Sequence, residues 1–129
     1  TGTVGNQPLY NNFMYNLNVK DKKDFKLALP TLQGTFFYKP DEIIRLEGEG
    51  NYTKFFFANK TTFLTSRTLR EYESIIESHG FIRIHKSHLV NKAYVVNYTA
   101  DAMLTMADDS KVEISRRRKE EVLTLLKTN

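Results

Sequence analysis

The sequence predicts a mostly β fold with small helices, of the α+β class. Its 129 residues suit one domain with a hydrophobic core, and 40% of them are hydrophobic against 26% charged. Nine Phe and seven Tyr residues, with no Trp, favour strands. Short apolar segments recur at roughly 8–12-residue intervals, which is typical of a sandwich or barrel rather than of a parallel α/β sheet.

Residues 1–24 are predicted to be a leader or linker, and residues 25–129 the folded domain. The leader contains "GTVGNQPLYNN", rich in turn formers, and the charge run "VKDKKD", which has no apolar period. The chain begins with Thr rather than Met. We therefore expect it to be a piece of a longer protein.

Short strands are predicted between turn-forming residues. Residues 25–29 alternate apolar and polar side chains up to Pro30, which should end the strand. Residues 41–51 begin with acidic side chains suited to a helix N-terminus, then pass through apolar residues into a Gly-rich turn. The remaining predicted strands are 34–40, 52–58, 61–66, 81–84, 93–99, 102–107 and 111–115, with "NK" at 59–60 as a hairpin turn.

Two helices are predicted, one in the middle of the chain and one at its C-terminal end. The middle helix spans 66–80, with Ser66 or Thr68 as its N-cap and Gly80 as its stop. The second spans 116–127. Their apolar stripes are Leu69, Tyr72, Ile75 and Ile76 in the first, and Val122, Leu125 and Leu126 in the second.

Composition limits the compartment and the partners. The absence of Cys excludes disulfides and thiolate metal sites and fits a reducing, cytoplasmic setting. No apolar run approaches the roughly 20 residues that span a bilayer, and no signal peptide opens the chain, so no membrane association is expected. A net charge of +4 favours anionic partners. The cations concentrate in "KVEISRRRK" at 111–119, whereas residues 41–50 are mainly acidic.

The segment "RIHKSHLVN" at 83–91 raises the question of a metal or catalytic site. His85 and His88 could ligate a metal, but zinc needs three or four ligands and only His79 remains. Ser87 has no nucleophile-elbow motif around it, and "GEG" at 48–50 lacks the rest of a phosphate-loop pattern. No metal, cofactor or enzyme activity is therefore expected.

Nucleic-acid binding explains more of the sequence. Arg116, Arg117, Arg118 and Lys119 follow a strand and open a helix, where positive charge opposes the helix dipole, so stability alone would not select it. Arginine forks onto phosphate and onto guanine. The segments "NYTK" at 51–54 and "HKS" at 85–87 add amides, hydroxyls and Lys at strand ends.

Four segments in this order resemble the LytTR DNA-binding domain: "IIRLEGEGNYTKFFF", "TLREYESII", "FIRIHKSHLVNKAYV" and "VEISRRRKEEVL". The resemblance covers residues 25–127. It implies an elongated, mostly antiparallel β fold whose loops enter successive major grooves of double-stranded DNA. It further implies the output domain of a bacterial response regulator, bound as a dimer to repeated half-sites, with the receiver domain absent from this chain.

Carried over by position, the resemblance implies three base-contacting residues. They are Thr53 (or its neighbours), Lys86 and Arg117. The family pattern has His at the first position and Asn at the second, so the docking mode is implied but not the base preference. The supporting residues are Asn51, Tyr52, Lys54, His85, Ser87, Arg116, Arg118 and Lys119.

Other residues of these motifs are predicted to be structural. Asn91 should tie a loop to backbone groups or adopt a left-handed conformation, and His88 should pack. His85 could either buttress its loop or touch DNA. The residues predicted to be in the core are Ile82, Ile84, Leu89 and Val90.

Two other functions stay open at this point. The basic rim could bind an acidic protein partner. A single-stranded nucleic acid could stack on Tyr52, Phe55 and Phe57, although alternation favours Phe55 and Phe57 as core residues.

Overall fold

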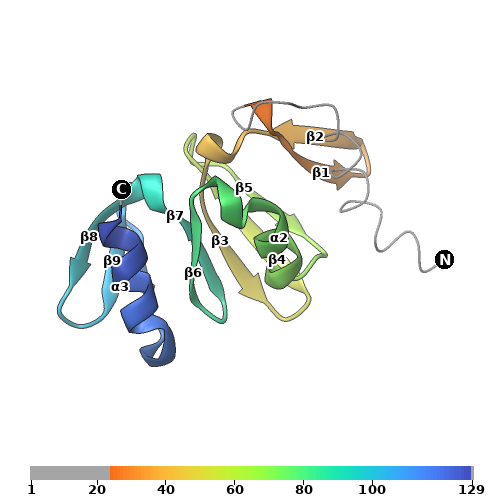
Figure 1. Ribbon diagram of the computed structural model, residues 1–129. Helices are drawn as coiled ribbons and strands as arrows, with labels where there is room; N and C mark the ends of the chain where they lie inside the picture. The colour runs from red at the N-terminus through yellow and green to blue at the C-terminus, as the bar shows by residue number, and fades with distance from the viewer. Residues whose placement is uncertain (1–23, 129) are drawn as a thin grey trace.

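The computed structural model describes residues 24–128, so the predicted leader, apart from Asp24, lies outside the described residues. Strands predominate, with two α-helices between them (Figure 1). The strands are β1 (Leu27–Thr31), β2 (Gly34–Tyr38), β3 (Ile43–Glu49), β4 (Tyr52–Phe57), β5 (Thr62–Thr65), β6 (Phe81–His85), β7 (His88–Asn91), β8 (Val95–Thr99), β9 (Met103–Met106) and β10 (Lys111–Glu113). The helices are α2 (Leu69–Ile76) and α3 (Lys119–Lys127). Short 3-10 turns are η2 (Pro40–Glu42), η3 (Glu77–His79), η4 (Lys92–Tyr94) and η5 (Arg116–Arg118).

The strands form three antiparallel sheets. The central sheet has five strands in the order β5-β4-β3-β7-β6, and a smaller one has the order β10-β9-β8. The hairpin β1–β2 forms a two-stranded sheet of its own. Figure 1 shows the hairpin, the central sheet with α2, and the small sheet with α3 following one another along the molecule. The predicted fold class is confirmed, although more strands form than the sequence indicated.

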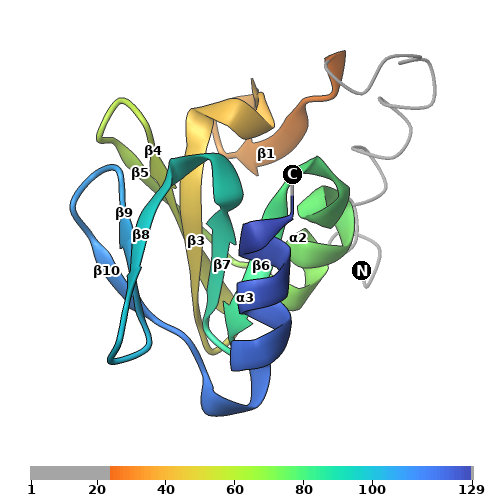
Figure 2. The same ribbon diagram turned by 60° about the vertical axis from the view of Figure 1, so that its left-hand side comes forward.

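The central sheet is buried on both faces. Leu46 and Leu89 belong to one hydrophobic cluster, which contains α2 and β1 residues. Ile44 and Val90 belong to the other, with residues of β9, β10 and α3. Figure 2 shows α3 and the small sheet beside this second face. The four predicted core residues of β6 and β7 are all buried, which confirms that prediction.

Helix α2 begins after a predicted N-cap but ends at Ile76, earlier than the predicted stop at Gly80. Thr68 is the N-cap: its Oγ1 accepts a hydrogen bond from Glu71 N at 3.3 Å, and the Glu71 carboxylate accepts one from Thr68 N. After Ile76 the chain tightens into η3 and stops at Gly80, whose φ of 88° is the left-handed conformation that glycine adopts easily.

Several boundaries differ from the sequence-based predictions. Pro30 lies inside β1 instead of ending it, because a strand of a two-stranded sheet has an open edge where the missing N–H is tolerated. The acidic start of 41–51 forms only the single turn η2, and the rest is β3. Residues 88–91 are a strand paired with both β3 and β6, and 92–94 form a turn instead of the start of a strand.

Asn91 links β7 to the start of β3. Its Nδ2 donates to Ile43 O at 2.9 Å and to Pro40 O at 3.2 Å, and its Oδ1 accepts from Ala93 N at 3.0 Å. Its φ of −83° is not left-handed. Asn91 therefore ties the chain to backbone groups, as predicted.

Candidate nucleic-acid interface

Three connections with predicted DNA-contacting residues meet at one end of the central sheet. They are the β3–β4 turn (49–52), the β6–β7 turn (86–87) and the segment 115–119; we call them the loop row. Gly48 N donates to Ser87 O at 2.8 Å, joining the first two, and Ser115 N donates to Ile84 O at 2.8 Å, joining the third to β6. Figures 1 and 2 show all three at the lower end of the sheet.

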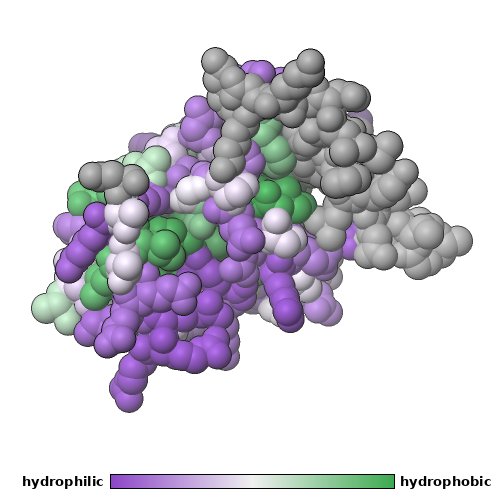
Figure 3. All heavy atoms as spheres, in the orientation of Figure 1, coloured by the Kyte–Doolittle hydropathy of each residue, from purple (hydrophilic) through white to green (hydrophobic). Residues whose placement is uncertain are grey.

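The antiparallel register explains why these connections meet. Glu47 pairs with His88, so the end of β3 lies beside the start of β7, and their turns are neighbours. Helix α2 comes close to the same end: a Cβ placed on Gly48 would lie 3.0 Å from Leu69 Cβ. Figure 3 shows hydrophilic residues gathered at the lower end of this face, over the start of α3 and the β6–β7 turn.

The β3–β4 turn exposes some of its predicted residues and buries one. Gly50 has a φ of 62°, which lets the chain reverse. Asn51 and Lys54 are exposed, and Tyr52 is 53% exposed. Thr53 is 0% exposed, and its hydroxyl donates to Arg67 O at 2.6 Å. This burial corrects the prediction for Thr53: its side chain cannot reach a base unless β4 is displaced.

The β6–β7 turn presents Lys86 to solvent and is fixed from beneath. Lys86 is exposed, and Ser87 is half-buried. Arg83 Nε donates to His85 O at 2.9 Å and Arg83 Nη2 donates to Lys86 O at 2.5 Å. His85 Nδ1 accepts from Ser87 N at 3.0 Å, so this imidazole does buttress the turn, as one of its two predicted roles required.

His88 lies behind the turn rather than in it. The side chain is half-buried, its ring centroid is 5.1 Å from that of His85, and its Nδ1 is 4.0 Å from Glu47 Oε1. Burial lowers the pKa of His88, and the Glu47 carboxylate only partly opposes this. A packing role, as predicted, is consistent with this position. Among residues 24–128, no group of three or more His, Asp or Glu side chains is placed to hold a metal ion.

The segment 115–119 starts a helix with exposed arginines. Ser115 is the N-cap of η5, and its Oγ accepts from Arg118 N at 3.3 Å. Arg116, Arg117 and Lys119 are exposed, whereas Arg118 is half-buried. The loop row thus carries exposed cations on its second and third connections, while Glu49 on the first is an exposed anion.

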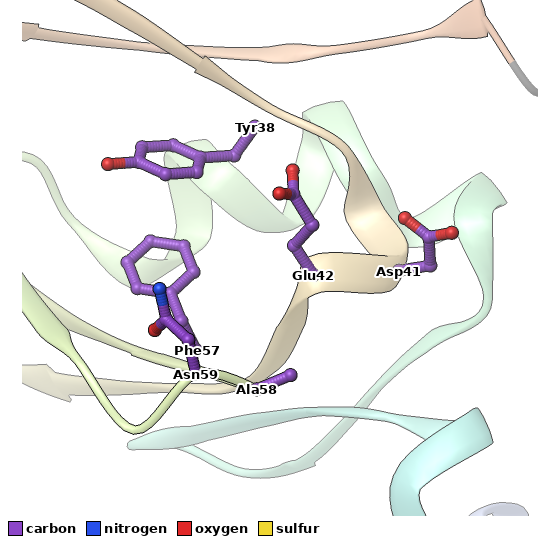
Figure 4. A pocket seen from close by; sticks show the side chains of 6 residues that line it. All are labelled: Tyr38, Asp41, Glu42, Phe57, Ala58 and Asn59. Atoms are coloured by element: carbon purple, nitrogen blue, oxygen red, sulfur yellow. The ribbon is translucent and has the colours of Figure 1, made fainter.

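A hollow at the opposite end of β3 has different chemistry. It has a volume of about 260 Å³ and is lined by Tyr38, Asp41, Glu42, Phe57, Ala58 and Asn59 (Figure 4). Figure 4 shows the two aromatic rings on one side and the Glu42 carboxylate facing them. Two carboxylates repel phosphate, so this hollow does not suit nucleic acid.

Comparison with known proteins decides the family. The family described as LytTr DNA-binding domain matches residues 33–127. The chain belongs to the LytTR family of DNA-binding domains. DNA binding is therefore the activity of this domain, and the resemblance seen in the sequence is confirmed.

Individual relatives of this LytTR domain are distant. RcoM 2 of Paraburkholderia xenovorans (strain LB400), a heme-containing CO-sensing transcriptional regulator, is 27% identical over 90 residues, covering 66% of this chain and 33% of RcoM 2. The sensory transduction protein LytR of Staphylococcus saprophyticus subsp. saprophyticus is 38% identical over 60 residues, covering 42% of this chain and 23% of LytR. The chain thus spans a third or less of these two curated relatives.

A solved LytTr DNA-binding domain from Bacillus cereus has the same fold. Its TM-score is 0.67 at 23% identity, and the match covers 80% of this chain and 97% of that one. Within the described part of our LytTR domain, no helix is long and apolar enough to cross a membrane.

Sequence reasoning found most of the loop row but not what supports it. Arg83 and Ser115 were not singled out, because the groups that they bond within the turn and at the start of η5 are backbone atoms, which no side-chain pattern encodes. The stacking alternative also loses two of its three residues, since Phe55 is 0% and Phe57 4% exposed. Of these three aromatic residues, Tyr52 alone is exposed, at 53%.

Proposed function

We propose that this LytTR domain binds double-stranded DNA sequence-specifically through the loop row, as the output module of a transcriptional regulator. The observation that carries the proposal is the joining of the three connections by the Gly48–Ser87 and Ser115–Ile84 hydrogen bonds. Exposed side chains of Lys86, Arg117 and Lys119 therefore project from one fixed base. Such a base holds several contacts in register at once.

The length of the loop row fits duplex DNA. Neighbouring strands of a sheet lie about 4.8 Å apart. In the order β4-β3-β7-β6, the β3–β4 and β6–β7 turns are about two strand spacings apart. Ser115 bonds Ile84 of the edge strand β6 and so lies about one spacing beyond that strand. The row is therefore roughly 15 Å long at the backbone, before long side chains extend it. This exceeds the ~6 Å width of the minor groove, so we propose that the row crosses a minor groove and that long side chains of its end loops extend into the major grooves on either side.

The predicted contact residues are given separate roles. Arg117 is the principal base reader, because its guanidinium can fork onto guanine O6 and N7. Lys86 contacts a base or a phosphate at the middle of the row. Tyr52 takes the place of the buried Thr53 in the first connection. The phosphate contacts are assigned to Asn51, Lys54, Ser87, Arg116, Arg118 and Lys119.

The regulator around this domain is proposed from its relatives. RcoM 2 is a transcriptional regulator, and this chain covers only a third of it. We place a sensor or receiver domain outside this chain and expect two copies of the LytTR domain on repeated half-sites. Two-fold or tandem repeats in the operator would mirror that dimer.

The test is selection of bound duplexes from a random library, followed by titration of the selected site. Enrichment of a repeated motif with fixed spacing supports the proposal. Arg117→Ala should cost about 1–3 kcal/mol of binding free energy and relax preference at one base position. Unchanged preference in that variant would remove Arg117 from the role.

Two variants that each remove one positive charge distinguish a phosphate contact from general electrostatic attraction. Lys119→Gln should weaken binding to all duplexes and reduce the slope of log affinity against log salt concentration by about one unit. Lys60→Gln removes the same charge from the exposed turn between β4 and β5, at the opposite end of the sheet, and should leave the slope unchanged. Equal effects from both variants would mean that no particular end of the domain faces DNA. If no duplex is enriched at all, an acidic protein partner becomes the better candidate.

A further inference from the structure

Arg83 lies under the β6–β7 turn with its whole guanidinium engaged inside the protein. Its Nε and Nη2 donate to the carbonyls of His85 and Lys86, at 2.9 and 2.5 Å. Its Nη1 is 2.5 Å from Glu73 Oε1 on helix α2. The side chain is only 14% exposed. Three of its five N–H donors are used, one on each nitrogen, and the side chain is mostly buried, so its main role is inside the protein.

These bonds fix the backbone of the residue that we assign to DNA. Lys86 itself is exposed, but its carbonyl is held by Arg83, and the next residue is held on both sides. Ser87 N donates to His85 Nδ1 at 3.0 Å, and Ser87 O accepts from Gly48 N at 2.8 Å. Three hydrogen bonds therefore hold the backbone of the two turn residues, Lys86 and Ser87, and Arg83 donates the one to Lys86.

We propose that Arg83, anchored by Glu73, is a positioning residue that sets the direction in which Lys86 meets DNA. The inference rests on the proposed function, because it requires Lys86 to contact DNA. This positioning depends on the planar, forked shape of the guanidinium, which donates to two successive carbonyls and to a carboxylate at once. A Lys ammonium on a flexible stem cannot reproduce that arrangement. Loss of the fork releases the turn, and a contact residue that is misplaced by about 1 Å loses much of its binding contribution.

The test uses the domain with its selected duplex and a scrambled one. Lys86→Ala should weaken the selected site roughly 5–150-fold if that contact is worth about 1–3 kcal/mol. Arg83→Met and Arg83→Lys should both weaken it roughly three- to tenfold and reduce its preference over the scrambled duplex. In the Lys86→Ala background, Arg83→Met should change affinity less than about twofold, because the two residues act as one unit.

Arg45→Met is the matched control. Arg45 is 11% exposed and pairs with Glu47 at 3.0 Å, as Arg83 pairs with Glu73, but its Nε donates to Ser110 Oγ at 3.2 Å and not to the backbone of the β6–β7 turn. It removes the same charge, so it should leave the preference for the selected site unchanged. Glu73→Ala, which releases the anchor without touching the turn, gives a second variant in case Arg83→Met does not fold.

The outcomes separate the two levels of the argument. If Lys86→Ala has no effect, the proposed role of Lys86 fails and the inference fails with it. If Lys86→Ala weakens binding but Arg83→Lys binds like the wild type, Arg83 acts through its charge and positioning is overturned. Additive losses in the double variant, or an equal loss in Arg45→Met, would also overturn it. Loss of preference in Glu73→Ala, with thermal unfolding confirming a folded domain, supports it.

Discussion

Replacing Thr53 with Val distinguishes its structural role from the base contact implied by family position. Valine keeps nearly the same shape and suits a strand, so β4 should stay intact. The substitution removes the hydrogen bond from Thr53 Oγ1 to Arg67 O at 2.6 Å. The bond from Thr65 Oγ1 to the Thr53 carbonyl does not involve the replaced side chain.

The expected cost follows from that single bond. An intramolecular hydrogen bond contributes about 0.5–1.5 kcal/mol net, and the loss of a short bond in a part-buried position raises this toward about 2 kcal/mol. The extra methyl group is buried and returns a few tenths of a kcal/mol. We expect the free energy of unfolding to fall by about 1–2 kcal/mol, which lowers Tm by roughly 5–10 °C in a domain of this size.

Urea unfolding and DNA titration measure the two roles separately. The urea midpoint should fall with an unchanged m-value, whereas affinity and base preference should stay within about twofold of the wild type. Thr62→Val, at an exposed position of β5, is the control and should change stability by no more than about 0.5 kcal/mol. A Thr53→Val domain of unchanged stability that has lost preference at one base would refute the reasoning.

Three further predictions concern the support of the loop row. Asn91→Ala removes three hydrogen bonds to backbone groups and should cost about 2–4 kcal/mol in urea unfolding. Gly48→Ala places a methyl group 3.0 Å from Leu69 Cβ, so we expect a loss of about 1–3 kcal/mol and a shift of α2 detectable by NMR. His88 has its folded-state pKa below the ordinary 6.5, so the unfolded chain binds more protons as the pH falls through that value, and stability present above about pH 6.5 is lost below it. His88→Gln should reduce that decline between about pH 7.5 and pH 5.5, and an unchanged decline would rule out His88 as its source.

The fold class and the core could be predicted because they depend on side-chain patterns. Residue type placed Ile82 and Ile84 in the interior, and alternation placed Phe55 there. Thr68 marked the start of the first helix, and Gly80 marked where the chain turns after η3. The strand β7 was missed because "HLVN" is too short to establish a period, and it forms by pairing with β3 and β6 on either side.

The candidate site was predicted in outline and missed in its supports. Exposed Lys86 and Arg117 follow from charge and strand ends, which are visible in the sequence. The burial of Thr53 was not predictable by transferring family positions alone. It depends on where the chain before α2 passes β4, and only the fold brings the Arg67 carbonyl there. The same holds for Arg83, because only the fold brings the His85 and Lys86 carbonyls and the Glu73 carboxylate around its guanidinium.

The bonding between neighbouring turns has a consequence for the DNA itself. Backbone hydrogen bonds join Gly48 to Ser87 and Ser115 to Ile84. The spacing between the DNA-contacting loops is therefore nearly fixed in the protein. A mismatch between that spacing and the grooves is then accommodated by the duplex. Bending energy depends on sequence, and pyrimidine–purine steps yield most readily. We therefore expect discrimination among operators at base pairs that no side chain touches, through the flexibility of the steps between the contacted positions.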